Sequence, residues 1–88
     1  MTNNNVVYTT NAICCFYKLR QEKINEMVSW GIASPIGSKP DKWLFTHDDF
    51  ERIGRASQFT NELKINIPGA ALTLQLLEDI ENLRDKES

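Results

Sequence analysis

The chain has 88 residues, 41% of them hydrophobic, and a formal net charge of −2 at pH 7, which fits one small domain with a limited core. No apolar run reaches the roughly 20 residues that cross a bilayer, and Met1–Asn5 lacks the basic and long apolar parts of a signal peptide. The only cysteines, Cys14 and Cys15, are neighbours and cannot link distant segments. A cytoplasmic location is therefore expected, and a disulfide scaffold is excluded.

Residues 6–31 predict a helix-turn-helix. Val6–Tyr8 is short and β-prone, and is expected to form an edge strand or a packed lead-in. Thr9 or Thr10 can cap a first helix that runs to about Leu19. A second helix is expected over about Gln21–Trp30, followed by Gly31 at positive φ. The packing positions of the first helix are expected to be Ala12, Ile13, Phe16 and Tyr17.

Residues 32–45 have the composition of a wing. Prolines and glycines mark turns in the first part of this segment, and Trp43–Phe45 is a short strand signal. Since side chains two apart lie on one side of a strand, Trp43 and Phe45 are both expected to pack on the core.

A third helix is predicted over residues 46–63. Thr46 and Asp49 form a T-x-x-D variant of the capping box, and Asp48 is also favoured near the positive end of the helix dipole. The expected inward positions are Phe50, Ile53, Ala56, Phe59 and Leu63.

The last predicted element is a long apolar helix over residues 66–84, with Asn66 as its N-cap and Pro68 in its first turn. Beyond it, residues 85–88 are expected to fray. One apolar row is expected to seal the core, and a second needs another molecule, either a copy of the chain or a partner; the alternative is a helix wrapped deeply by a monomeric core. The rows are Ala70, Leu74 and Leu77, and Leu72, Leu76, Ile80 and Leu83.

The sequence offers no pattern for catalysis or for binding a cofactor or a metal. His47 is the only histidine, and no second reacting group accompanies it. The glycines are isolated, so a phosphate-binding loop is not expected. Two adjacent thiols and one distant histidine do not make a zinc site. We therefore expect neither enzyme activity nor a cofactor.

Binding to DNA is a serious alternative for a winged helix-turn-helix. The candidate contacts are Arg20, Gln21, Lys23 and Lys42, but Glu22 and Glu26 would face the same phosphates. Residues 18–55 carry a net charge of +1 and residues 56–88 carry −3. The acidic end favours a basic protein partner.

Several segments resemble the CbpM chaperone-modulator family, within the MerR-like winged helix-turn-helix group. The resemblance covers nearly the whole chain, and its most specific segment is Asn66–Ile80. The fold class is thus expected to be mainly α, a small MerR-like winged helix-turn-helix. MerR-type DNA binders usually carry an arginine-tyrosine wing, which is replaced here by Trp43 and Phe45. The other matching segments are Ile24–Val28 leading to Gly31, Ile32 and Pro35, the strand Trp43–Phe45, and Arg52-Ile53 with Arg55-Ala56.

The resemblance implies a protein that binds the J-domain of a CbpA-like, DnaJ-type co-chaperone and restrains its work with DnaK and its binding of DNA. J-domains dock on DnaK through a basic helix, so carboxylates are the expected contacts. Charge and presumed exposure select Asp48, Asp49, Glu78, Asp79 and Glu81. A homodimer through Leu72, Leu76, Ile80 and Leu83 is compatible with either function.

Overall fold

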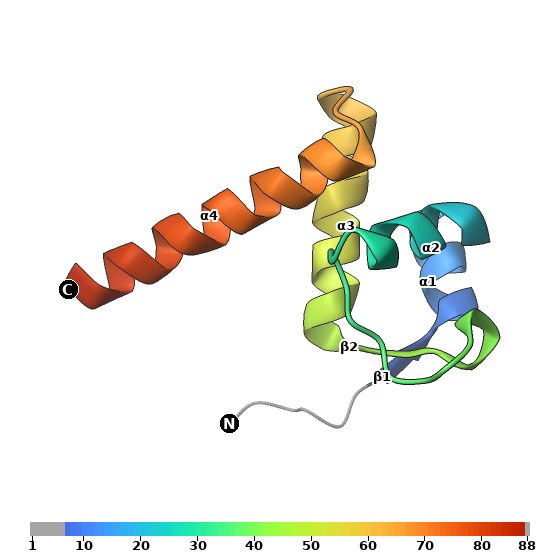
Figure 1. The fold of residues 1–88 in the computed structure, drawn as a ribbon. Coiled ribbons are helices and arrows are strands. Elements are labelled where there is room, and N and C mark those ends of the chain that lie inside the picture. The colour runs from blue at the N-terminus through green and yellow to red at the C-terminus, as the bar shows by residue number, and fades with distance from the viewer. Residues whose placement is uncertain (1–6, 88) are drawn as a thin grey trace.

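A computed structural model describes residues 7–87, with side chains up to Arg84, so the expectation for Val6 lies outside it. Four helices and a small antiparallel sheet make up the fold, and the sheet lies at one side of the helices (Figure 1). The elements in chain order are β1 (Val7–Thr9), α1 (Thr10–Tyr17), α2 (Gln21–Ser29), the 3₁₀ turn η1 (Pro40–Lys42), β2 (Leu44–Thr46), α3 (His47–Glu62) and α4 (Ile67–Glu87).

Helices α1 and α2 form the predicted helix-turn-helix. The Thr9 side chain accepts a hydrogen bond from the Ala12 N–H and caps α1. α1 ends two residues before the predicted Leu19 because Lys18 adopts a left-handed conformation, with φ of 58°. The turn then delivers the chain to α2, whose N-cap residue, Arg20, makes no side-chain capping bond.

The C-terminus of α2 is closed by a Schellman motif. Gly31 has φ of 81°, as predicted, and its N–H donates to the Val28 carbonyl at 3.0 Å. The Ile32 N–H donates to the Met27 carbonyl at 3.0 Å. This sharp reversal turns Ile32 and Ala33 inward, where both are buried.

The wing returns to the body as β2, which pairs with β1 in register Tyr8 to Phe45. β2 starts one residue later than predicted because Trp43 closes the 3₁₀ turn. Phe45 is fully buried, and the half-buried Trp43 packs edge-on against it at 6.0 Å between ring centroids. Both aromatic side chains therefore contact the core, as expected.

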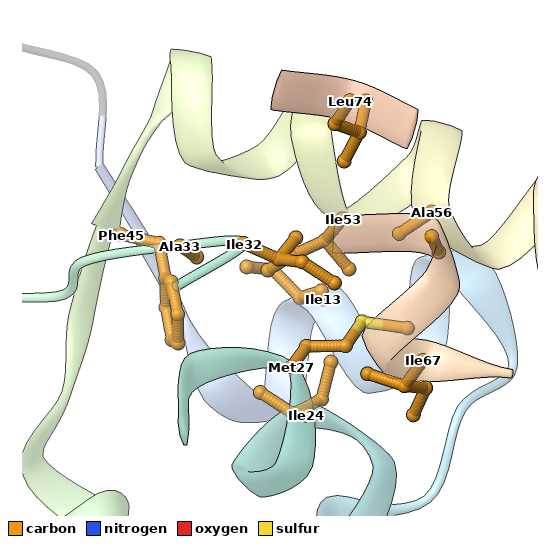
Figure 2. Packing of buried hydrophobic residues seen from close by; sticks show 11 residues of the cluster. Ile13, Ile24, Met27, Ile32, Ala33, Phe45, Ile53, Ala56, Ile67 and Leu74 are labelled. Atoms are coloured by element: carbon orange, nitrogen blue, oxygen red, sulfur yellow. The ribbon is translucent and has the colours of Figure 1, made fainter. Parts of the chain in front are cut away.

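α3 and the start of α4 complete the core (Figure 2). The predicted capping box of α3 is present, and α3 ends at Glu62, one residue before the predicted end. Leu63, predicted to face inward, is exposed because it caps the end of α3 and Lys64 then turns the chain at φ of 57°. The buried core contains Ile13, Ile24, Met27, Ile32, Ala33, Phe45, Ile53, Ala56, Ile67, Ala70 and Leu74.

α4 begins on the body and then leaves it. Asn66 accepts a hydrogen bond from the Gly69 N–H at 2.8 Å, as its N-cap role requires. The second half of the helix extends away from the other helices (Figure 1), and the radius of gyration is 13.5 Å, against about 12 Å for a compact chain of this length. The helix is long, as predicted, and continues past Arg84 to Glu87 instead of fraying there. Its second half is largely polar, since residues 78–87 carry five carboxylates.

Candidate partner-binding surface

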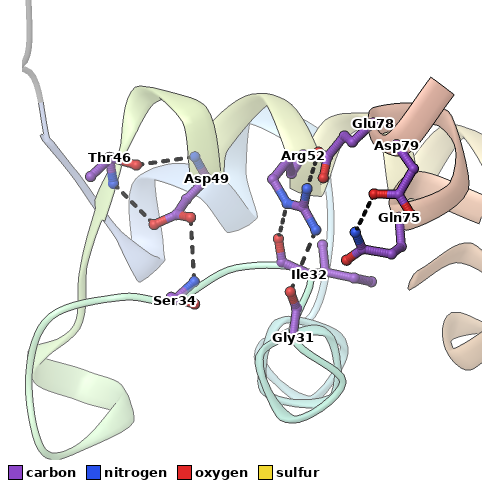
Figure 3. Close-up of polar contacts among 9 residues, drawn as sticks. All are labelled: Gly31, Ile32, Ser34, Thr46, Asp49, Arg52, Gln75, Glu78 and Asp79. Atoms are coloured by element: carbon purple, nitrogen blue, oxygen red, sulfur yellow. Dashed lines mark hydrogen bonds and ion pairs between the residues drawn. The ribbon is translucent and has the colours of Figure 1, made fainter. Parts of the chain in front are cut away.

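Arg52 joins α3, α4 and the segment after α2 (Figure 3). Its Nε donates to the Ile32 carbonyl at 2.6 Å, and its Nη2 lies 3.5 Å from the Gly31 carbonyl. Its Nη1 donates to the Glu78 carboxylate in an ion pair. Both charged side chains are partly exposed, so Arg52 acts as a surface clamp at the point where α4 leaves the body.

Asp49 is engaged within the fold. Its carboxylate accepts hydrogen bonds from the Thr46 N–H and the Ser34 N–H, each at 3.3 Å (Figure 3). Its own N–H donates to the Thr46 hydroxyl at 3.1 Å. With only 9% of the residue exposed, Asp49 connects the start of α3 to the wing segment and offers little surface to a partner.

The five carboxylates selected from the sequence therefore divide into two groups. Asp49 and Glu78 hold the fold together. Asp48, Asp79 and Glu81 are exposed. Asp79 accepts a hydrogen bond from Gln75 at 3.1 Å, and the described side chains give Asp48 and Glu81 no hydrogen bond or ion pair. The presumption of exposure was wrong for Asp49, because a capping carboxylate close to a folded-back loop is buried.

The two apolar rows of α4 face different directions. Ala70 and Leu74 are fully buried, and Leu77 is half-buried. At 100° per residue the centre of the second row lies about 130° around the helix from the centre of the first. We call it the leucine stripe, and its members are 51% to 61% exposed: Leu72, Leu76, Ile80 and Leu83.

The residues selected for DNA binding lie on the helix-turn-helix and the wing. Arg20, Lys23 and Lys42 are exposed. Gln21 is half-buried, and its amide donates to the Asn25 side chain at 2.8 Å. Glu22 and Glu26, also exposed, place two carboxylates on the same short helix.

An aromatic cluster covers the junction of β1, α1 and α3, and sequence reasoning missed it. Tyr8 stacks on Phe50 with ring centroids 4.3 Å apart, and Phe16 meets Phe50 edge-on at 5.0 Å. Phe16 was expected to pack inward, but it is 67% exposed because it lies at the outer edge of the cluster. The sequence feature that could have indicated this cluster is Gly54, a glycine in the middle of an otherwise regular helix.

Tyr17 fixes the inner side of this cluster. Its hydroxyl donates to the Phe50 carbonyl at 3.0 Å. Burial raises the pKa of Tyr17, and the nearby Glu51 carboxylate and Tyr8 add to that rise. The phenol therefore stays protonated and remains a donor.

Comparison with known proteins relates this architecture to regulators. A sequence model described as MerR HTH family regulatory protein matches residues 8–87. A Citrobacter koseri protein named chaperone modulatory protein CbpM is 33% identical over 86 residues, which cover 98% of this chain and 85% of that protein. The chain belongs to the CbpM family. Its fold is accordingly a MerR-like winged helix-turn-helix, mainly helical as predicted.

Other CbpM proteins show the same relationship. One from Coxiella burnetii strain Dugway 5J108-111 is 41% identical over 68 residues, which cover 77% of this chain and 64% of that protein. One from Escherichia coli O1:K1 / APEC is 29% identical over 86 residues, covering 98% and 85%. The names of these CbpM relatives describe chaperone modulators and not enzymes.

Two further observations concern the described residues alone. Among the side chains of residues 7–84, no group of three or more from histidine, cysteine, aspartate and glutamate is arranged to hold a metal ion. None of the helices in that range combines the length and apolarity of a membrane span.

Proposed function

We propose that this CbpM-family protein binds the J-domain of a CbpA-type co-chaperone and thereby restrains its work with DnaK and its binding of DNA. The observation that carries the proposal is the family match over nearly the whole chain. The proposed partner also requires a cytoplasmic location.

Three exposed carboxylates support an electrostatic part in this binding. Asp48 lies in the first turn of α3, and Asp79 and Glu81 lie on the half of α4 that extends from the body. A basic helix of the J-domain would be attracted to them and oriented by them. Glu78 lies beside Asp79 but is already paired with Arg52, so its contribution to binding is secondary.

Charge reversal tests these residues. Replacing Asp48, Asp79 and Glu81 together by lysine is expected to weaken J-domain binding about 10-fold, mostly through slower association, because exposed charges act by steering. Calorimetric titration with the isolated J-domain measures the change. The matched control reverses Glu22 and Glu26 on α2, which are exposed but outside the proposed surface, and should bind like the wild type. Equal affinity of the triple variant and the wild type would remove these carboxylates from the interface.

The leucine stripe supports self-association through a second copy of the chain. Its four side chains span the 12 residues 72–83 of α4, about 16 Å from the first to the last. Each half-exposed side chain that becomes buried contributes on the order of 1 kcal/mol, and a two-fold axis would place two identical stripes against each other. The four side chains are exposed, and the second half of α4 extends away from the other helices (Figure 1).

Aspartate in the stripe should separate the copies without unfolding them. Leu76→Asp and Ile80→Asp are each expected to yield a folded monomer, because a charge cannot be buried unpaired in such an interface. Light scattering gives the mass, and far-UV circular dichroism gives the helix content. Ile36→Asp, at another exposed apolar position, on the wing, should remain dimeric. A monomeric wild type at high concentration would contradict the self-association, and unfolding of the variants would place the stripe in the core.

DNA binding remains the alternative function. It would use Arg20, Lys23 and Lys42, with Gln21 first released from Asn25. It predicts duplex binding that falls steeply with salt. Absence of any shift of duplex DNA at low salt would exclude it.

A further inference from the structure

The aromatic cluster leaves one large apolar side chain held in place but uncovered. Phe16 packs edge-on against Tyr17 at 4.9 Å and against Phe50 at 5.0 Å between ring centroids. Two rings thus fix its orientation, although 67% of the residue is exposed. An aromatic side chain that is already ordered loses little conformational entropy when a partner covers it.

The cluster is built at a cost to α3. A methyl group at Gly54 would overlap the Tyr17 hydroxyl, so glycine is required there for the ring to fit. Glycine in a helix interior costs about 1 kcal/mol relative to alanine. The Tyr17 hydroxyl then donates to the Phe50 carbonyl, which joins α1 to α3 through the two rings that Phe16 contacts.

Carboxylates border the cluster on the α3 side. A hydrogen bond of 2.9 Å joins the His47 Nδ1 and the Tyr8 hydroxyl. The His47 Nε2 lies 3.3 Å from the Glu51 carboxylate. Asp48 is exposed in the same first turn of α3. Arg55, one turn beyond Glu51 on α3, is also exposed. Asp48 and Glu51 therefore place two carboxylates at the rim of the cluster.

We infer that this face, formed by Phe16, Tyr8, His47 and Phe50 with Asp48 and Glu51 at its rim, docks a helix of the partner that presents basic and apolar side chains together. A guanidinium or ammonium group fits over the exposed face of Phe16 through a cation–π contact. Its charge is balanced by the two rim carboxylates. This inference rests on the proposed function, under which the docking helix belongs to the J-domain.

The aromatic face and the leucine stripe then have separate occupants. Charged rim residues steer association, but buried aromatic anchors supply most of the affinity at protein interfaces. The leucine stripe is aliphatic and is assigned to a second copy of the chain. Asp48 connects the proposed carboxylate contacts to the aromatic face, where Phe16 supplies the anchor that those carboxylates lack.

The test compares J-domain binding by the wild type, Phe16→Ser and Phe16→Tyr in calorimetric titrations. Phe16→Ser is expected to bind about 10- to 30-fold more weakly, the effect of losing an aromatic anchor. Phe16→Tyr keeps the ring and should stay within about threefold of the wild type. Ile36→Ser, which removes another exposed apolar side chain (70% exposed), should bind like the wild type.

The outcomes separate this inference from the proposed function. If the wild type binds and Phe16→Ser binds equally well, the aromatic face is not the docking site, while the proposed function stands. If the wild type does not bind, the proposed function fails and the inference fails with it. If Phe16→Ser does not fold, amide hydrogen exchange of the wild-type complex replaces it. Protection of residues 12–17 and 47–51 on binding is expected, and protection confined to α4 would overturn the inference.

Discussion

Leu74→Ala is expected to lower the free energy of unfolding by about 3 kcal/mol. Leu74 is fully buried between α4 and the body, together with Ile53 and Ala56 of α3 (Figure 2). Removing most of its isobutyl side chain takes away buried apolar contacts and leaves a cavity that the surrounding core residues cannot fill completely. In a domain of this size the loss is a large part of the total stability. Chemical denaturation followed by circular dichroism measures it.

Leu76→Ala is the matched control on the same helix. Leu76 lies two residues further along α4, on the opposite side, and is 53% exposed. Both substitutions are compared in the Ile80→Asp background, so that self-association does not add to the stability. There Leu76→Ala should change the free energy of unfolding by less than about 0.5 kcal/mol. Equal losses from the two substitutions would contradict the division of α4 into a core side and a free side.

Arg52→Met is expected to lower the free energy of unfolding by about 2 kcal/mol. The variant keeps an apolar stem of similar length but gives up the charged hydrogen bonds to the Ile32 and Gly31 carbonyls and the ion pair with Glu78. Because both charges are partly exposed, the ion pair contributes less than the bonds to the carbonyls. Thermal and urea denaturation should agree on the loss.

Two further variants separate the contribution of the Glu78 ion pair to stability from that of the hydrogen bonds to the carbonyls. Glu78→Gln should cost less than Arg52→Met, because the bonds to the two carbonyls persist. Arg55→Met, a cation one turn away that is exposed, should be nearly neutral. A neutral Arg52→Met would show that α4 and the segment after α2 are held by apolar packing alone.

Much of the fold could be predicted from the sequence because capping and turn residues mark where the helices begin and end. Thr46 and Asp49 marked the start of α3 through the capping box, and Gly31 marked the end of α2 through its positive φ. Asn66 marked the start of α4. Each of these signals lies within a few residues of the structure that it specifies, so periodicity and capping rules were sufficient.

The features of the fold and of the candidate site that the sequence did not predict depend on contacts between residues far apart in the sequence. The hydrogen bond that the Ser34 N–H donates to the Asp49 carboxylate joins residues 15 positions apart in the sequence. The carboxylate is buried there, although its charge had led us to expect it on the surface. The pair of Arg52 with Glu78 crosses 26 residues. Phe16 follows Ile13 at helical spacing, so periodicity predicted burial, but the ring lies at the outer edge of a cluster formed with α3.

The most direct test of the proposed function is a calorimetric titration of the wild-type protein with the isolated J-domain of a CbpA-type co-chaperone at two salt concentrations. We expect saturable binding that weakens several-fold from low to high salt, because exposed carboxylates steer the association while buried aromatic contacts hold the complex. Absence of binding at both salt concentrations would contradict the account. The chain would then share the fold of its family without this activity, and DNA binding would become the leading function.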